Sequence, residues 1–212
     1  MKISADNLQK MPDRERAALV NSLSGFKSAN LVGTANPEGR CNLAIMSSVV
    51  HLGSSPALLG LIIRPGSEER HTLSNILASG YYSLNHVTSE IVAAAHQTAA
   101  RYDSETSEFE ATGLTPQWWQ GFDAPLVQEA RVKLAMQLRE HQPLAINGTH
   151  FIIGEVLAIE LPETILSEDG SVDLVEADTV ALSGLDRYHR ASLHKRMAYA
   201  KPDLPPREIE SS

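Results

Sequence analysis

One stretch, residues 42–75, decides the fold: N-L-A-I-M-S-S-V-V-H-L, then G-S-S-P, then A-L-L-G-L-I-I-R-P, then G-S-E-E-R-H-T-L-S-N. Two apolar runs of strand length are separated by a turn at Gly53–Pro56. After a short acidic loop, a helix is expected to begin at Thr72. The adjacent Ser47 and Ser48 lie within the first run. Hydroxyl groups, a cationic side chain and a helix N-terminus together suit a small anion, and phosphate is the obvious candidate.

The segments around this stretch predict a mainly β, antiparallel fold. A strand at Asn30–Ala35 pairs, across the turn signal N-P-E-G-R, with a strand at Asn42–His51, and Ala57–Ile63 follows the next turn. Another strand is expected at Tyr81–His86. Consecutive strands with short connections are typical of a meander rather than of β-α-β units.

The segment 124–140 suits a helix by propensity, and it also alternates loosely as a strand. We predict a long hairpin of Val127–Leu138 with His150–Glu160, because the second of these strands needs a partner in the sheet.

Helical spacing predicts peripheral helices at Asp13–Leu23, Thr72–Ala78 and Ser89–Ala100. Gly80 is expected to end the second helix, and Ser89 to cap the third. The segment 101–121 is polar and irregular, which suits a surface lobe or binding lid. A loop and a helix are expected within 184–200, followed by an extended tail at 201–212. No repeat or linker divides the chain, so residues 1–212 are predicted to form one domain.

Bulk properties exclude several classes of protein. The chain has 212 residues and a formal net charge of −8, which argues against nucleic acid or an anionic membrane as a partner. The single cysteine, Cys41, excludes an internal disulfide. No apolar run has the length of a signal peptide or a membrane span, so a cytoplasmic protein is predicted.

Familiar catalytic motifs are absent. The sequence contains no G-x-G-x-x-G after a strand, no G-x-x-x-x-G-K-[ST], no G-x-S-x-G and no H-E-x-x-H. We therefore predict no metal site, and no acid–base pair can be assigned.

Four blocks, in this order, resemble the flavin reductase-like family with an FMN-binding split barrel. They are N-L-A-I-M-S-S, a proline turn leading into an apolar strand, R-H-T-L-S-N-I, and G-Y-Y-S-L-N-H. The segments G-E-V-L-A-I at 154–159 and G-L-D-R-Y-H-R at 184–190 also look like later family blocks. The resemblance covers roughly residues 28–200, which would form the core of the single domain.

The resemblance implies an antiparallel split β-barrel with peripheral helices, and a site for FMN. Serine hydroxyls and amides would face the cofactor, the strand backbone at 42–46 would bind the edge of the ring, and a basic group with the helix N-terminus would hold the phosphate. The end of the Tyr81–His86 strand would lie close to the flavin. The implied cofactor-binding residues are Asn42, Ala44, Ile45, Met46, Ser47, Ser48, Arg64, His71, Thr72, Asn85, His86 and Val87.

Residue types alone leave other roles open at several of these positions. Ser47 and Ser48 also suit a polar strand edge, and Thr72 suits a helix cap. Arg64 also suits a solvated strand end. His86 could equally be a partly buried histidine whose ring nitrogens make hydrogen bonds to neighbouring residues.

The function implied is that of an FMN-binding oxidoreductase that uses NADH or NADPH to reduce flavin or another small electron acceptor. A homodimer is expected, and an oxygenase is a further candidate partner. One alternative is a protein that holds FMN for electron transfer or sensing, without NAD(P)H turnover. Another keeps the barrel but uses the flavin on an organic substrate, with the 101–121 lobe shaping the pocket.

Two departures from the family pattern leave the substrate and the nicotinamide preference open. Ile45-Met46 stands where members often have Pro-Tyr or Thr-Ala, and Pro56-Ala57 stands where many have Pro-Pro.

Overall fold

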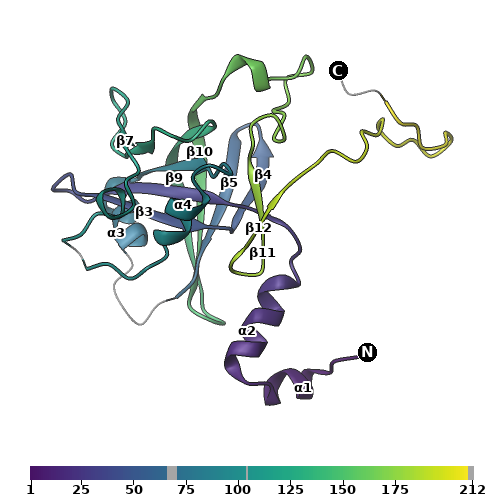
Figure 1. Ribbon diagram of the computed structural model, residues 1–212, viewed down its shortest axis with the longest axis horizontal. Helices are drawn as coiled ribbons and strands as arrows, with labels where there is room; N and C mark the ends of the chain where they lie inside the picture. Colours follow the sequence, from purple (N-terminus) through teal and green to yellow (C-terminus); the bar gives the residue numbers. More distant parts are fainter. Residues whose placement is uncertain (66–70, 104, 210–212) are drawn as a thin grey trace.

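The computed structural model describes residues 1–65, 71–103 and 105–209. Its body is a seven-stranded sheet in which every neighbouring pair is antiparallel, in the order β3-β2-β6-β9-β10-β5-β4. Helices lie at its periphery, and both ends of the chain project from it (Figure 1). The strands are β2 (Asn30–Ala35), β3 (Cys41–Met46), β4 (Val49–Ser54), β5 (Ala57–Ile63), β6 (Tyr81–His86), β9 (Lys133–Leu144) and β10 (Thr149–Glu160). The predicted mainly β, antiparallel fold is confirmed.

Two smaller sheets and several short helices complete the structure. A three-stranded sheet has the order β1-β11-β12, and β7 pairs with β8. These strands are β1 (Lys27–Ser28), β7 (Pro116–Gln117), β8 (Leu126–Val127), β11 (Val180–Ser183) and β12 (Arg187–Arg190). The helices are α1 (Ala5–Lys10), α2 (Asp13–Ser22), α3 (His71–Ser79), α4 (Val92–Gln97), α5 (Glu108–Thr112) and a 3-10 turn at Glu163–Ile165. None of the helices in the described ranges is long and apolar enough to span a bilayer.

The predicted single strand Asn42–His51 is wrong, because the chain leaves the ladder at Ser47 and Ser48. β3 pairs with β2, whereas β4 pairs with β5, and β3 and β4 are the two edges of the sheet. Two residues thus connect opposite edges, and three Cα–Cα steps span at most about 11 Å. The sheet must therefore curve until its edges approach each other, and the expected three-strand meander is instead two hairpins.

The curved sheet buries apolar side chains on both of its faces. β2 is buried along its whole length, and its alternating residues contribute to two different clusters. Val32 packs with Leu61, Tyr82 and other residues of the sheet and of α3. Leu31 belongs to a second cluster, which the sheet forms with α4, α5 and their flanking segments.

Other predicted elements hold only in part. The long hairpin is confirmed as β9 with β10, but β9 begins at Lys133 because Val127 belongs to β8 and pairs with Pro116. Gly80 ends α3 as predicted, with φ of +77° and its N–H donating to the carbonyl of Ile76. The expected acidic loop at 66–70 lies outside the described residues.

Three expectations about helices and loops need correction. The helix predicted at Ser89–Ala100 is only Val92–Gln97, because the Ser89 amide and hydroxyl bind Asp178 instead of capping it. The helix expected within 184–200 is absent from those described residues, which form β12 and then an irregular segment. The 101–121 lobe is irregular but contains α5 and β7.

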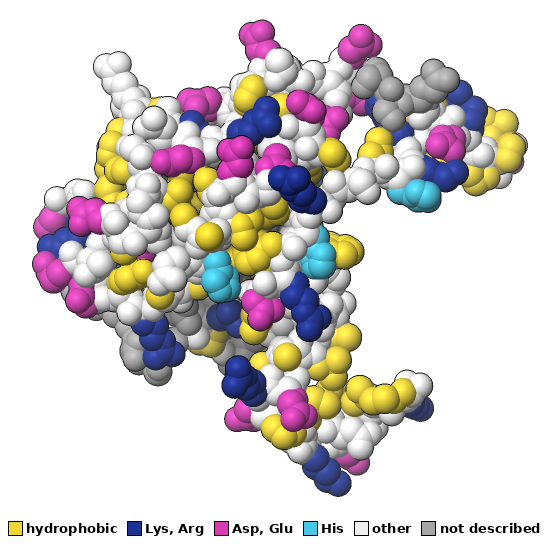
Figure 2. Space-filling model, viewed as in Figure 1, with side chains coloured by type: hydrophobic (Ala, Val, Ile, Leu, Met, Phe, Trp, Pro, Cys, Tyr) yellow, Lys and Arg dark blue, Asp and Glu magenta, His cyan; other side chains and the backbone are white. Residues whose placement is uncertain are grey.

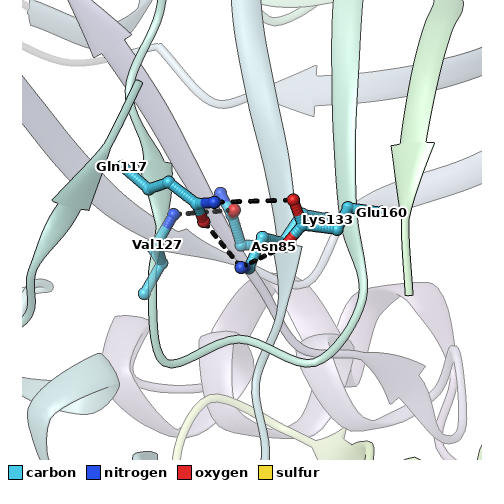
Figure 3. A network of polar contacts seen from close by, with 5 residues as sticks. All are labelled: Asn85, Gln117, Val127, Lys133 and Glu160. Carbon is cyan, nitrogen blue, oxygen red and sulfur yellow. Dashed lines mark hydrogen bonds and ion pairs between the residues drawn. The ribbon is translucent and has the colours of Figure 1, made fainter. Parts of the chain in front are cut away.

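A buried polar network fixes the lobe to the sheet (Figure 3). The Lys133 ammonium is 2.6 Å from Glu160 Oε1 and 2.6 Å from Gln117 Oε1. Only 5% of Lys133 is exposed. The partners neutralise and hydrogen-bond the charge, as burial of an ammonium requires.

Candidate functional site

A cavity of about 980 Å³ opens beside β3 and the Ser47–Ser48 link. It is at the upper end of the size range of ligand pockets. Its walls come from the α2–β1 segment, β3, the start of β4, the end of β5, the starts of α3 and α5, the end of α4 with the residues that follow it, and the β11–β12 hairpin. Nine of the residues implied by the resemblance line it: Asn42, Ala44, Ile45, Met46, Ser47, Ser48, Arg64, His71 and Thr72.

The other three, Asn85, His86 and Val87, lie outside this lining. Asn85 is fully buried, where its amide donates to the Leu31 carbonyl and its Oδ1 accepts from the Val127 amide at 2.9 Å (Figure 3). His86 Nδ1 lies 3.2 Å from Thr179 Oγ1. Val87 is part of the core. The structure therefore does not bring these three residues into the cavity.

A polar cluster anchors the start of α3 to the sheet. Asn42 Nδ2 donates to Thr72 Oγ1 at 3.0 Å and to Thr34 Oγ1 at 3.3 Å, and Asn75 Nδ2 donates to Thr34 Oγ1 at 3.1 Å. All four residues are buried. Thr72 is the second residue of α3, so two residues predicted as ligands also hold each other in place at the cavity wall.

The amides along the open edge of β3 already have acceptors. The Leu43 N–H donates to Glu108 Oε2, and the Ile45 N–H donates to Thr98 Oγ1, both at 2.9 Å. Glu108 is 8% exposed and Thr98 is 3% exposed. These two backbone donors are therefore engaged, in contrast to the expectation that the strand backbone would bind a ring edge.

Glu108 is the acidic residue of the cavity wall, and no sequence motif pointed to it because it lies in the irregular lobe. Burial raises the pKa of its carboxyl group, and the hydrogen bond from the Leu43 amide opposes that shift. The carboxylate also borders a neighbouring cavity of about 290 Å³, together with Asn42 and His71. Cys41 lines the smaller cavity, where burial raises the pKa of its thiol.

The charge of the large cavity is opposite to that of the chain. Lys27, Arg64, His71, His96 and Arg101 line it, and Glu108 is the one carboxylate among the described residues of its wall. A chain with a net charge of −8 thus gathers basic groups in one place. Such a wall favours an anionic ligand.

The two serines differ in what they can offer to a ligand. The Ser48 hydroxyl donates to the Ile62 carbonyl at 2.6 Å, and the Ile62 amide donates back to the Ser48 carbonyl. Ser47 makes no side-chain hydrogen bond within the described ranges and remains available. Within the same ranges, no cluster of three or more histidine, cysteine, aspartate or glutamate side chains has a metal-binding arrangement.

Comparison with known proteins agrees with this architecture. Residues 23–179 match the model of the flavin reductase like domain. A crystal structure of a proposed flavin reductase with a split barrel domain, from Shewanella frigidimarina, is 50% identical with a TM-score of 0.91, covering 94% of this chain and 100% of that one.

Two further matches are more distant in sequence. Nitrilotriacetate monooxygenase component B from Bacillus cereus is 21% identical with a TM-score of 0.81, covering 92% of this chain and 98% of that one. An uncharacterised protein of Aquifex aeolicus is 28% identical over 162 residues, which are 76% of this chain and 82% of the relative. The family match spans well over half of the sequence and agrees with the split-barrel fold, so the chain belongs to the flavin reductase-like family.

Proposed function

We propose that the large cavity binds FMN and that the protein is an oxidoreductase which uses NADH or NADPH to reduce flavin or another small acceptor. The observation that carries this proposal is the basic cavity wall in an acidic chain, next to the hydroxyl of Ser47 and the start of α3. Membership of the flavin reductase-like family supports it.

The residues present suit FMN. Arg64 supplies a charged donor for a phosphate, His71 supplies a ring nitrogen, Ser47 supplies a hydroxyl, and the first turn of α3 carries a partial positive charge. Ala44 and Met46 offer apolar contact to a ring system. The electron-transfer chemistry itself is a property of flavin, so the chain has to bind and orient it and exclude water.

Side chains that bond to β3 and to α3 act on this site indirectly. Glu108 and Thr98 hold β3 through its amides, and Asn42 holds α3 through Thr72. Both walls of the proposed phosphate site are thereby fixed before a ligand arrives, which reduces the entropic cost of binding.

The test separates phosphate recognition from ring recognition. FMN and riboflavin are titrated by fluorescence quenching into the natural protein and into Arg64→Gln, with His51→Gln, an exposed position outside the cavity, as the control. Loss of one charge-assisted hydrogen bond should lower the affinity for FMN about tenfold and the affinity for riboflavin less than twofold. The double change Ser47→Ala, Thr72→Ala should abolish FMN binding. Unaltered FMN affinity in both variants would reject this assignment.

The steady-state assay separates the reductase from a protein that only holds FMN. Sustained NAD(P)H oxidation with added FMN supports the reductase, whereas tight FMN binding without oxidation supports the electron-transfer or sensor alternative. Reduced flavin released by a reductase could serve an oxygenase. This candidate partner is consistent with the name of the Bacillus cereus relative, a monooxygenase component B.

We also propose a homodimer that covers the cavity rim. Phe26, Val50 and Ile62 line the cavity yet are 70%, 42% and 37% exposed. Neither α1 nor α2 buries a residue, and both project from the body with hydrophobic side chains on their surface (Figures 1 and 2). Unpartnered apolar surface of this kind typically marks an interface.

Sedimentation velocity tests the dimer. Phe26→Asp should shift a dimer towards monomer, because a charge would be buried between the copies. Ile146→Asp, at the fully exposed tip of the β9–β10 hairpin and outside the cavity lining, is the control. A monomeric natural protein would contradict the proposal.

A further inference from the structure

Lys27 lies where three separate elements of the structure meet. It is in β1, directly opposite Leu182 of β11. Its ammonium donates to the Asn21 carbonyl at the end of α2 and to the Gly184 carbonyl in the β11–β12 turn, both at 3.0 Å. The residue is half-buried and lines the large cavity.

The charge of this ammonium has no counter-charge in the described ranges. Both of its hydrogen-bond partners are neutral carbonyls, and no carboxylate of those ranges forms an ion pair with it. An ammonium has three donors, so one remains for another acceptor. Partial burial of an unpaired charge is unfavourable unless an anion completes the site.

The neighbours of Lys27 form a surface suited to a nucleotide. Leu182 lies opposite both Lys27 and Tyr188, so the three residues form one cross-strand row, and all three line the cavity. Side chains directly opposite each other in antiparallel strands share a face. The Tyr188 hydroxyl lies 3.0 Å from His96 Nδ1, and the two rings meet edge to face. A cation beside an aromatic pair suits a phosphate that is attached to a base.

We propose that Lys27 binds the phosphate of a nucleotide at a second subsite of the large cavity, distinct from the one at Arg64 and His71. The nucleotide fits the reduced nicotinamide that exchanges hydride with flavin, so this inference rests on the proposed function. The two subsites come from different sheets, since Lys27 belongs to the β1-β11-β12 sheet and Arg64 follows β5 of the large sheet.

The experiment compares Lys27→Met, which keeps the aliphatic stem, with Lys27→Arg, which keeps the charge. Lys195→Met is the matched control, because Lys195 is an exposed lysine of the C-terminal segment and is outside the cavity lining. ADP, NADH, NADPH, FMN and riboflavin are titrated by calorimetry, at low and at high salt. ADP reports the phosphate subsite without requiring flavin.

Lys27→Met should lower the affinity for ADP and for the dinucleotides about tenfold. This loss of affinity should be smaller at high salt, because ionic screening already weakens the contact between the ammonium and the phosphate. Lys27→Arg should restore most of the affinity, and Lys195→Met should change nothing. A loss confined to FMN relative to riboflavin would overturn the inference, because it would place the phosphate of the flavin itself at Lys27 and leave no second subsite there. Equal affinities of the natural protein and Lys27→Met for every phosphate ligand would overturn the inference.

The outcomes also distinguish this inference from the proposed function. If the natural protein binds ADP through Lys27 but binds no flavin, the proposed function fails alone. If it binds FMN and Lys27→Met changes the affinity for none of the ligands, only the proposal of the Lys27 subsite is contradicted. Thermal unfolding verifies that each variant is folded, and Lys27→Gln replaces Lys27→Met should the latter not fold.

Discussion

At the scale of single residues, close packing determines which glycines cannot change. At Gly154 an added Cβ would lie 2.1 Å from the Tyr82 hydroxyl, and at Gly33 it would lie 2.1 Å from the Pro125 carbonyl oxygen. Tyr82 is fully buried, and among the described residues its hydroxyl has no hydrogen-bond partner. Sequence alone cannot identify such positions, because the clash involves residues far apart in the chain.

Gly154→Ala should lower the free energy of unfolding by about 2–3 kcal/mol, because the ring of Tyr82 is held on all sides and cannot retreat. Gly53→Ala is the matched control, since it is also a strand glycine and its nearest neighbour would be 3.5 Å from the new Cβ. Chemical denaturation measures both. Equal stability of the two variants would contradict the packing argument.

His86 should make stability depend on pH. Burial lowers its pKa to about 4, well below the ordinary value of 6.5. Because the unfolded chain takes up a proton at higher pH than the folded one, the contribution of neutral His86 is present above about pH 6.5 and is lost as the pH falls towards 4.

Between pH 7 and pH 5 the loss from His86 should be about 2 kcal/mol. Denaturation curves at several pH values measure it. His86→Gln should flatten this slope, whereas His51→Gln, at an exposed position, should leave it as it is. A slope that His86→Gln does not change would show that other groups cause it.

At the scale of elements, the start of α3 is held by side chains rather than by apolar packing alone. Thr72→Val removes the acceptor of the Asn42 amide at a buried position. Stability should fall by about 1–2 kcal/mol, and FMN affinity should fall with it, because the wall of the proposed phosphate site loosens.

Thr112→Val is a suitable control for that change, since the Thr112 hydroxyl bonds only the Glu108 carbonyl within its own helix and is not part of the cavity. Unfolding and FMN titration are measured on both variants. If the Thr72→Val variant is destabilised but binds FMN with unchanged affinity, the start of α3 does not contribute to FMN binding.

Apolar patterns in the sequence identified most strands, because a strand buried on one face has alternating apolar residues and a strand buried on both faces has a continuous apolar run. The break between β3 and β4 at Ser47–Ser48 could not be recognised in this way, since apolar residues continue on both sides of it. Asn85 belongs to a sequence block typical of the family and was therefore predicted to contact the cofactor. Its side chain instead makes hydrogen bonds within the fold. Lys27, Thr98 and Glu108 could not be predicted, because contacts across the chain bring them to the cavity.

At the scale of the whole molecule, the curvature of the sheet creates the site. Only when the two edges approach can Ser47 and Ser48 connect them, and the cavity opens beside that connection. The lobe and the β1-β11-β12 sheet then enclose it from either side, and basic residues from several elements converge there. A basic cavity in a chain with a net charge of −8 favours binding of anions at that one place.

The most direct measurement is an anaerobic titration of the purified protein with FMN, followed by visible absorbance before and after reduced nicotinamide is added. We predict saturable binding of FMN, with flavin bands that bleach on addition of NADH or NADPH. Failure of FMN to bind at any concentration would contradict the assignment of the cavity to FMN.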